Sequence, residues 1–562
     1  MKKHSINSKT KSKINAAKEE GMKKYVFRNE GLWALQHLDL DPKKKKVAWD
    51  EFIQGLYAIF TWAFNGEIEI VSHDLCNLEK KVLQKVDGFE TISIDPCVKG
   101  SCNVGTSRIF LPGGKIDTGI AGRPGFGSFE KQLSKIPSGG YVLIEDDIFS
   151  GGTFKQVLRL LEAHGITIIK TVFQIQVGNP KAINIPIESL EKYESGEIID
   201  LNDPRDFLAG SFGGGLVIQY SDGLVRAPYV LPFVDSHARS SIPKEKVLNF
   251  SKRIWELNIA FWQNFPEIEI NDGEKYFARM LIRMGYSGKE KLVDVCKDML
   301  NLLNFPDNPP KTKAEKGIIF IDLNDTFIDN NNLTVSAEEL KTAISKAQEK
   351  GWEIGLCSDS PEEPLKKWAV EHGINGPVIY ENGQPVLQEK LDTKNIKKII
   401  GDWAKDNAIE ILPETIAPEF GGKICGDGIA LGYGRKYSIS IFCWKDNSPN
   451  AFLTEALGNY LNKNLMELDI DCAPEYGFIG IHSSDYRKMK GKALRAIGWA
   501  LHKENKECWM LGNSVSDATQ APALCGFGSV ANASDQTKNM ADIIAKSSFT
   551  QGVIELIEKI IS

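Results

Sequence analysis

The sequence predicts an α/β protein with two parallel-sheet units joined by a linker, and three observations lead to this prediction. Tyr141–Ile144 is a short apolar run typical of a buried parallel strand, and an amphipathic helix is expected over 154–164. Gly317–Ile321 is a second strand of the same kind. Between them, Phe305–Lys313 combines prolines with polar and basic residues, which is the composition of an exposed linker.

Length and composition exclude several classes of protein. A chain of 562 residues exceeds what one core usually holds, so two or three domains are expected. The net charge of -6 gives no global attraction to nucleic acid, and the lysine-rich segments 1–24 and 43–46 are typical of solvated surface. Ten scattered cysteines without metal or redox spacing predict reduced thiols in the cytoplasm. No secretory signal or membrane span is expected, and a homo-oligomer is compatible with the sequence.

Changes in composition along the chain predict the order of its elements. Residues 1–65 are predicted to be a helical N-terminal extension, and 66–240 the first parallel-sheet unit with helical additions. Residues 241–304 are predicted to be helical. The linker covers 305–316, and 317–562 form the second, Rossmann-like unit, in which a cap is inserted at about 384–485.

The residues after the first strand form a phosphate cradle. Glu145 and Asp146 follow the strand, and Ser150–Thr153 form a glycine turn at the start of the helix. Helix N-termini bind phosphate, glycines let the backbone approach an anion, and carboxylates accept hydrogen bonds from sugar hydroxyls. This order of residues resembles the signature of type I phosphoribosyltransferases, which use 5-phosphoribosyl pyrophosphate (PRPP). An ordinary strand, acidic turn and helix without a ligand is the alternative.

The resemblance implies roles for individual residues. Glu145 and Asp146 would accept hydrogen bonds from the ribose 2′- and 3′-hydroxyls and could help to hold Mg²⁺. The residues that would wrap the 5′-phosphate are Ser150, Gly151, Gly152 and Thr153. Lys99 lies in a glycine- and serine-rich loop where this family binds pyrophosphate, and a plain surface loop fits that segment equally well.

Two further segments complete the expected transferase site. Gly113–Ser128, with Lys115 and Arg123, suits the mobile catalytic lid of the family, which excludes water. Asp203–Leu216 suits part of the hood that binds the acceptor. The candidate contacts for the acceptor or for pyrophosphate, with salt bridges as the alternative role, are Arg205, Asp206 and Arg226.

The second unit carries four motifs in order. Asp322 follows the strand 317–321, Ser358 ends a second strand, Lys490 opens a helix, and Leu511–Asp517 forms a polar turn after another strand. This order resembles the motifs of haloacid dehalogenase-type phosphatases. The run from Pro377 to Gly383 resembles the start of the inserted α/β cap of the Cof-type subfamily, whose members often act on sugar phosphates.

This second resemblance implies a phosphoryl-transfer mechanism. Asp322 would attack phosphorus to give an aspartyl phosphate, while Ser358 and Lys490 would steady the phosphoryl oxygens. The residues implied as Mg²⁺ ligands are Asp322, Asn513 and Asp517.

The sequence departs from the family pattern at two of these positions. Asn324 stands where the family has the aspartate that protonates the leaving group, and Asn513 replaces the first acid of the fourth motif. Because general acid catalysis is worth roughly 10²- to 10⁴-fold, alkoxide leaving groups should suffer most. A hydrolase that prefers better leaving groups, such as anhydrides, and a degenerate domain that binds phosphate without turnover are both open, as is a scaffolding domain.

The leading hypothesis is a bifunctional enzyme with Mg²⁺ as cofactor. PRPP-dependent phosphoribosyl transfer to a nucleobase or small heteroaromatic acceptor would be coupled to hydrolysis of a phosphate ester or anhydride on a phosphorylated small molecule. One alternative is a regulatory protein that senses PRPP or a nucleotide and carries a silent second domain. Another is a phosphatase whose transferase-like half binds a nucleotide. A nucleic-acid partner is not expected.

Overall fold

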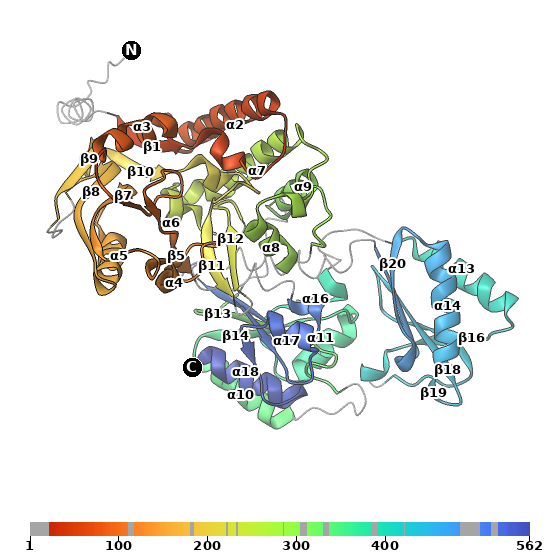
Figure 1. The fold of residues 1–562 in the computed structure, drawn as a ribbon. Coiled ribbons are helices and arrows are strands. Elements are labelled where there is room, and N and C mark those ends of the chain that lie inside the picture. Colours follow the sequence, from red (N-terminus) through yellow and green to blue (C-terminus); the bar gives the residue numbers. More distant parts are fainter. Residues whose placement is uncertain are drawn as a thin grey trace, which may run out of the picture.

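The computed structural model contains an N-terminal unit, a C-terminal core and a cap that projects from the core (Figure 1). The residues that the structure describes are 22–110, 117–179, 185–220, 223–231, 234–284, 286–303, 312–329, 337–383, 391–420, 422–483, 506–518 and 526–562. Within them, no helix is long and apolar enough to cross a membrane, and the nine described cysteines are free of disulfides. The prediction of an α/β fold with parallel sheets is confirmed. Most of the predicted linker lies outside the described residues.

A five-stranded parallel sheet forms the centre of the N-terminal unit, with strand order β4-β3-β7-β8-β9. Its strands are β3 (Thr91–Ser93), β4 (Cys102–Asn103), β7 (Gly139–Ile148), β8 (Ile166–Val177) and β9 (Ile187–Tyr193). Helix α5 (Gly152–Ala163) follows β7 and packs on β8. Because β7 pairs with β8 as far as Ile148, Glu145 and Asp146 lie within the C-terminal end of the strand, whereas they were predicted to follow it. The carboxyl ends of these strands share one edge of the sheet.

Strand β1 (Lys23–Asn29) corrects the prediction that residues 1–65 are helical. It lies at the centre of a second parallel sheet, between β2 (Ile68–Asp74) and β10 (Ile198–Asn202). Tyr25, Val26 and Phe27 are fully buried there, and aromatic and β-branched residues favour such a pleated surface. The pairing partners are distant in sequence, so local helical preference did not decide the structure of this segment.

The rest of the N-terminal unit is a mixed sheet and a helical layer. The sheet order is β12-β11-β5-β6, formed by β5 (Thr106–Phe110), β6 (Asp117–Gly122), β11 (Leu216–Tyr220) and β12 (Gly223–Ala227). The predicted helical character of much of 1–65 and of 241–304 is seen in α2 (Pro42–Ala63), α7 (Val247–Trp262), α8 (Lys275–Arg283) and α9 (Leu292–Leu303). Helix α7 packs on both α2 and α9, and aromatic side chains of α2 and α7 share one buried cluster with aliphatic side chains of α9. Shorter helices are α3 (Leu75–Lys85), α4 (Phe129–Leu133) and α6 (Ser236–Ser240).

The C-terminal core is a six-stranded parallel sheet with order β15-β14-β13-β22-β23-β24. Its strands are β13 (Gly317–Ile321), β14 (Trp352–Cys357), β15 (Val378–Ile379), β22 (Glu507–Gly512), β23 (Gly526–Ser529) and β24 (Ile543–Ile544). Its helices are α10 (Ala337–Glu349), α11 (Glu362–Glu371), α16 (Val515–Ala518), α17 (Asp535–Met540) and α18 (Phe549–Ile561). Every residue of β13 is buried, as expected for the central strand of a parallel sheet. Arg283 Nη2 of the N-terminal unit donates to the Met540 carbonyl at 3.1 Å, which joins this core to that unit.

The cap is a separate sheet with two helices, inserted between β15 and β22. Its strand order is β16-β17-β18-β21-β20, formed by β16 (Ile411–Thr415), β17 (Gly428–Gly432), β18 (Ile439–Lys445), β20 (Leu468–Ala473) and β21 (Phe478–Ser483). Helices α13 (Thr393–Asp406) and α14 (Ala451–Asn464) share a buried cluster with this sheet. Figure 1 shows the cap set to one side of the core.

Candidate active sites

Arg28 of β1 lies at the centre of the acidic site in the N-terminal unit. Its side chain is 1% exposed, and its guanidinium contacts Asp95 at 3.1 Å, Asp146 at 3.1 Å and Asp203 at 2.8 Å. Gln174 of β8 also donates to Asp95. Four segments that are distant in the sequence thus meet on one cation. Sequence analysis missed Arg28 and Asp95, because neither belongs to a recognisable motif.

The pKa values of the three consecutive acids at the end of β7 are shifted in different directions. Burial opposes ionisation of Asp146, yet the Arg28 guanidinium and two hydrogen bonds within the acidic turn outweigh it and lower the pKa of Asp146 well below its usual range. Burial and the neighbouring Asp146 charge raise the pKa of Asp147 to about 8 and also raise the pKa of Glu145. One fixed negative charge therefore lies between two carboxyls that favour the protonated form.

The predicted phosphate loop stands at the exposed start of α5. Gly151 adopts φ +75°, a left-handed conformation that glycine enters without strain, and Ser150, Gly152 and Thr153 are exposed. Among the described residues, no side chain caps this helix. The N-terminus of α5 can therefore accept an anion, and it directly follows the acids of β7.

The other predicted transferase residues divide into exposed and internally paired groups. Lys99 is exposed in the loop after β3. Arg123 donates from Nε to the Thr106 carbonyl at 3.1 Å, and its Nη1 is buried with no hydrogen-bond partner in the described part of the chain. Burial and Arg205 lower the pKa of Arg123, whereas Asp146 acts in the opposite direction, so this guanidinium faces the acidic cluster. Lys115 lies outside the described residues.

The proposed acceptor contacts are engaged within the protein. Arg205 pairs with Glu30 at 3.3 Å and with Asp203. Asp206 accepts from the Gly215 N–H at 2.7 Å, and burial, reinforced by Asp203, raises its pKa to about 6. Arg226 Nη1 donates to the Gly213 carbonyl at 2.8 Å. The structure therefore gives these three side chains partners that support the loop itself.

The second candidate site lies at the carboxyl ends of three neighbouring strands of the core. Asp322 follows β13 and is 9% exposed, Ser358 follows β14, and Asn513 follows β22. The Asp322 N–H donates to the Leu511 carbonyl at 2.9 Å, which fixes its backbone beside β22. Thr326 Oγ1 contacts both the Asp322 carboxylate, at 3.4 Å, and the Asn513 amide oxygen, at 2.9 Å. The structure thus brings the predicted nucleophile and Asn513 together.

Asp517 is fully buried beside the same edge. Its Oδ2 accepts from the Ser514 N–H at 3.1 Å and from Ser514 Oγ at 2.7 Å. A Cβ on Gly512 would come within 2.4 Å of the Asp517 side chain, so glycine is needed for this close approach. The donor set of two carboxylates and an amide oxygen suits Mg²⁺, a hard cation that prefers oxygen. Within the described ranges, no group of three or more His, Cys, Asp or Glu side chains is assembled for a metal, so the amide of Asn513 would be needed.

Of the two remaining predicted catalytic residues, the structure describes only Asn324. Asn324 forms an isolated parallel bridge with Ile328 in the turn after β13, two residues beyond Asp322. Lys490 lies outside the described residues. The amide at 324 therefore occupies the turn in which the implied general acid would lie.

A hydrogen-bonded clasp joins the cap to the core next to Ser358. Glu381 is fully buried in the core, and its carboxylate accepts from the N–H groups of Lys436 and Tyr437, at 3.0 and 2.9 Å, and from Ser438 Oγ at 2.9 Å. Glu381 and Asn382 both have positive φ, +45° and +54°, which costs about 1–3 kcal/mol each for such residues. The Asn382 N–H donates to the Ser358 carbonyl at 3.0 Å, so this strained turn connects the cap to the site.

Arg435 forms the second half of the clasp. Its Nη1 donates to the carbonyl and to Oδ1 of Asp359, at 2.8 and 3.1 Å, and to Ser438 Oγ at 2.9 Å. Asp359 directly follows Ser358 in the chain. The cap residue therefore contacts the neighbour of a predicted phosphate ligand.

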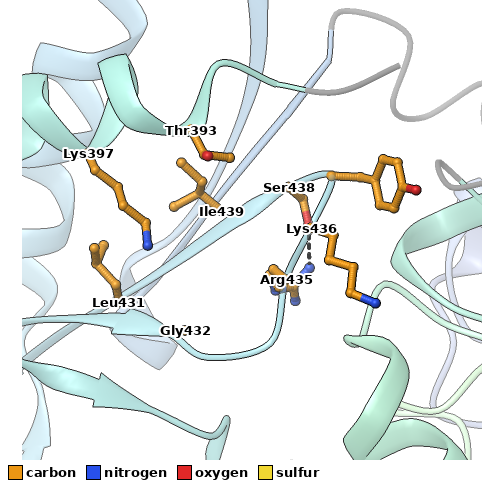
Figure 2. Close-up of a pocket in the computed structure, with 9 residues that line it drawn as sticks. Thr393, Lys397, Leu431, Gly432, Arg435, Lys436, Ser438 and Ile439 are labelled. Atoms are coloured by element: carbon orange, nitrogen blue, oxygen red, sulfur yellow. Dashed lines mark hydrogen bonds between the residues drawn. The ribbon is translucent and has the colours of Figure 1, made fainter. Parts of the chain in front are cut away.

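A pocket in the cap lies behind this clasp (Figure 2). It has a volume of about 290 Å³, and its lining includes three cations and no carboxylate. Figure 2 shows Lys397 extending from α13 towards the space beside Leu431 and Arg435. The cations are Lys397, Arg435 and Lys436, which also pair with acids outside the lining. Such a pocket favours an anionic group.

Comparison with known proteins bears on the C-terminal site. A model of the haloacid dehalogenase-like hydrolase family matches residues 319–417. A phosphoglycolate phosphatase of Methanobrevibacter smithii is 25% identical over 244 residues, which cover 43% of this chain and 97% of that protein. A phosphoglycolate phosphatase of Staphylothermus marinus is 23% identical over 240 residues, 43% of this chain and 95% of that protein. The C-terminal part of the chain therefore carries a haloacid dehalogenase-like hydrolase domain.

Solved structures of similar proteins were also found. A haloacid dehalogenase-like hydrolase of Bacteroides thetaiotaomicron is 15% identical with a TM-score of 0.34, and the match covers 44% of this chain and all of that one. A protein of Thermoplasma acidophilum is 15% identical with a TM-score of 0.31, covering 43% of this chain and 97% of that one.

Proposed function

We propose that the chain is a two-site enzyme, with a C-terminal phosphatase for a small phosphorylated substrate and an N-terminal PRPP-dependent phosphoribosyltransferase. The observation that carries the phosphatase proposal is the position of Asp322, at the carboxyl end of β13 between Ser358 and Asn513. Ligands of open parallel sheets bind at that edge. The similarity to haloacid dehalogenase-like hydrolases supports the same site.

In the phosphatase step, the Asp322 carboxylate attacks phosphorus, the P–O bond to the leaving group breaks, and that group departs with the bonding electron pair. Water then hydrolyses the aspartyl phosphate to inorganic phosphate and restores the carboxylate. Ser358 donates a hydrogen bond to a phosphoryl oxygen. Mg²⁺ held by Asp322, Asn513 and Asp517 would offset the repulsion between the anionic nucleophile and the phosphate. Because Asn324 cannot supply a carboxyl proton, the reaction favours leaving groups that depart as stable anions.

The substrate of this phosphatase is a small phosphate ester or anhydride with a second anionic group. Two matched relatives are named phosphoglycolate phosphatases, whose substrate carries a carboxylate besides the phosphate. In this chain, the cationic lining of the cap pocket, which includes Arg435 of the clasp, favours such a substrate.

The N-terminal proposal rests on the acids of β7 and the start of α5. Asp146 is held ionised by Arg28, and its side chain remains 27% exposed, so it can still accept from ribose hydroxyls. The open N-terminus of α5 favours the 5′-phosphate, with Ser150 and Thr153 as added donors. Lys99 in the loop after β3 and Arg123 would contact pyrophosphate. Glu145 and Asp146 could also contact Mg²⁺.

Two assays test these proposals separately. Phosphate release should be measured from phosphoglycolate and p-nitrophenyl phosphate with the wild-type and Asp322→Asn proteins. Loss of the nucleophile should lower turnover by about 10³-fold or more. PRPP binding should be measured by calorimetry with the wild-type and Asp146→Asn proteins, and a fall in affinity of about tenfold is expected. Unchanged phosphate release in Asp322→Asn would overturn the phosphatase site.

The alternative of a PRPP sensor is favoured by one observation, the amides at 324 and 513 in the phosphatase site. Tight PRPP binding together with no phosphate release and no pyrophosphate release would support the sensor. A homo-oligomer and a cytoplasmic location are part of the proposal, and size-exclusion chromatography with light scattering would test the first.

A further inference from the structure

A second cavity lies at the carboxyl edge of the five-stranded sheet and borders the predicted phosphate loop at Ser150. Its volume is about 470 Å³, within the range of small-molecule sites. Phe149, next to the phosphate loop, leaves 38% of its surface exposed here, which is unusual for a large aromatic side chain. The other residues that line it are Ser150, Val177, Asn179, Ser195 and residues 198–199.

The described lining of this cavity combines apolar side chains with neutral polar groups. Phe149, Val177 and two isoleucines supply the apolar walls, while two serines and Asn179 supply hydrogen-bonding groups. Among the described residues that line the cavity, none is ionisable. Burial of an unpaired charge against such walls is costly, so a charged ligand is disfavoured. A flat ring that stacks on Phe149 and hydrogen-bonds at its edge fits these surfaces.

The strand order places this cavity on a particular side of the phosphate loop. The loop after β3, which carries Lys99, lies on one side of β7, and β8 and β9 lie on the other. The cavity is lined by the end of β8 and the loop after it, by Ser195 after β9 and the start of β10, and by Phe149 and Ser150 after β7. A group bound over β7 would therefore have the predicted pyrophosphate loop on one side and the cavity on the opposite side.

We infer that this cavity is the acceptor pocket of the transferase, and that it takes an uncharged, flat nitrogen heteroaromatic ring. The inference rests on the proposed transferase function. Displacement at C1 of the ribose requires the acceptor to approach opposite the leaving pyrophosphate. The lone pair of a ring nitrogen forms the new bond to C1 while the bond from C1 to the pyrophosphate oxygen breaks. Its electron pair leaves with pyrophosphate, and a nitrogen that carried a proton loses it to solvent.

The location differs from the one predicted from the sequence. The segment 203–216 was expected to form part of the acceptor hood, but Arg205 and Asp206 there have partners within the protein. The cavity is instead lined by the residues just before and within the start of β10. No motif marks these residues, and only the strand order brings them next to Ser150.

Two probes of equal size and different charge test the inference on the full-length protein. Nicotinamide and nicotinate are titrated, with calorimetric detection, into protein saturated with Mg²⁺ and PRPP. Nicotinamide should bind at least about tenfold more tightly, because only nicotinate brings a charge to the neutral lining. Phe149→Ala should weaken nicotinamide binding by about two- to tenfold, the worth of one aromatic contact. Ile199→Lys should shift the preference towards nicotinate.

Controls separate this inference from the proposed transferase. PRPP affinity should stay within about twofold in Phe149→Ala, and Phe452→Ala, a matched change on the cap surface, should alter neither probe. PRPP that binds without either probe, equal affinities for both probes, or equal effects of the two alanine variants would overturn the pocket assignment. Loss of PRPP binding in the wild type would instead overturn the transferase proposal, together with this inference.

Discussion

The two candidate active sites hold their charges in different ways. In the N-terminal unit, three carboxylates share the buried guanidinium of Arg28, and every partner belongs to the same unit. In the C-terminal domain, Asp322 and Asn513 meet in the core, while the substrate side is completed by a cap held through Glu381. The charges of the first site are therefore brought together when the N-terminal unit folds. The second depends on the closure of two bodies, so a variant can impair it and leave both folded.

The change with the largest expected effect is Arg28→Met, which breaks the N-terminal site. It leaves Asp95, Asp146 and Asp203 without their shared cation, and removal of one partner of such a cluster costs about 3–5 kcal/mol. Urea unfolding should show this loss, and PRPP binding should disappear. Arg159→Met, an exposed arginine of α5, is the matched control. Equal stability of the two variants would contradict the central role of Arg28.

Asn324→Asp alters the C-terminal site and should raise its phosphatase activity. The new carboxyl can protonate a leaving alkoxide, so turnover of phosphoglycolate should rise by about 10²-fold. p-Nitrophenyl phosphate has a good leaving group and should change by less than about threefold. Equal changes for both substrates would show that the position acts through structure rather than through proton donation.

Glu381→Ala tests whether the cap must be clasped. The carboxylate loses three hydrogen bonds from residues 436–438, and a hydrogen bond to a charged group is worth about 1.5–3 kcal/mol. kcat/KM for phosphoglycolate should fall by about tenfold or more, and small-angle X-ray scattering should detect a more open domain. Glu362→Gln removes two surface pairs, with Lys436 of the cap and with Lys366 of its own helix, and should change kcat/KM by less than about twofold. If both variants behave alike, Glu381 does not control closure.

The smallest effect is expected from a change of one pH unit. The pKa of Asp147 is raised to about 8 from its ordinary 3.8 by burial and by the Asp146 charge. The folded unit therefore binds more protons than the unfolded chain between these values, and its free energy of unfolding should fall as pH rises from 5 to 8, by up to about 1.4 kcal/mol per unit. Asp147→Asn should flatten this slope in urea titrations. The exposed Asp87→Asn should keep it, and an unchanged slope in Asp147→Asn would refute the assignment.

The sequence reveals those parts of the sites that lie in short continuous motifs. Asp322, Ser358 and the glycine turn before α5 were all found from a strand followed by polar residues. Arg28 and Glu381 were not assigned roles, because their partners are distant in sequence and only sheet pairing or cap docking brings them together. Strand β1 shows the same limit. Its pairing with β2 and β10 is a long-range contact, so residues 1–65 suggested helix alone.

The most direct test of a two-site enzyme follows pyrophosphate and phosphate separately, with Mg²⁺-PRPP and nicotinamide as acceptor, in wild-type, Asp146→Asn and Asp322→Asn proteins. Pyrophosphate release should require nicotinamide and fall about tenfold or more in Asp146→Asn, but stay unchanged in Asp322→Asn. Phosphate release, measured in parallel from phosphoglycolate, should fall in Asp322→Asn and stay unchanged in Asp146→Asn. Pyrophosphate release that is absent with the acceptor, or insensitive to Asp146, would contradict the account.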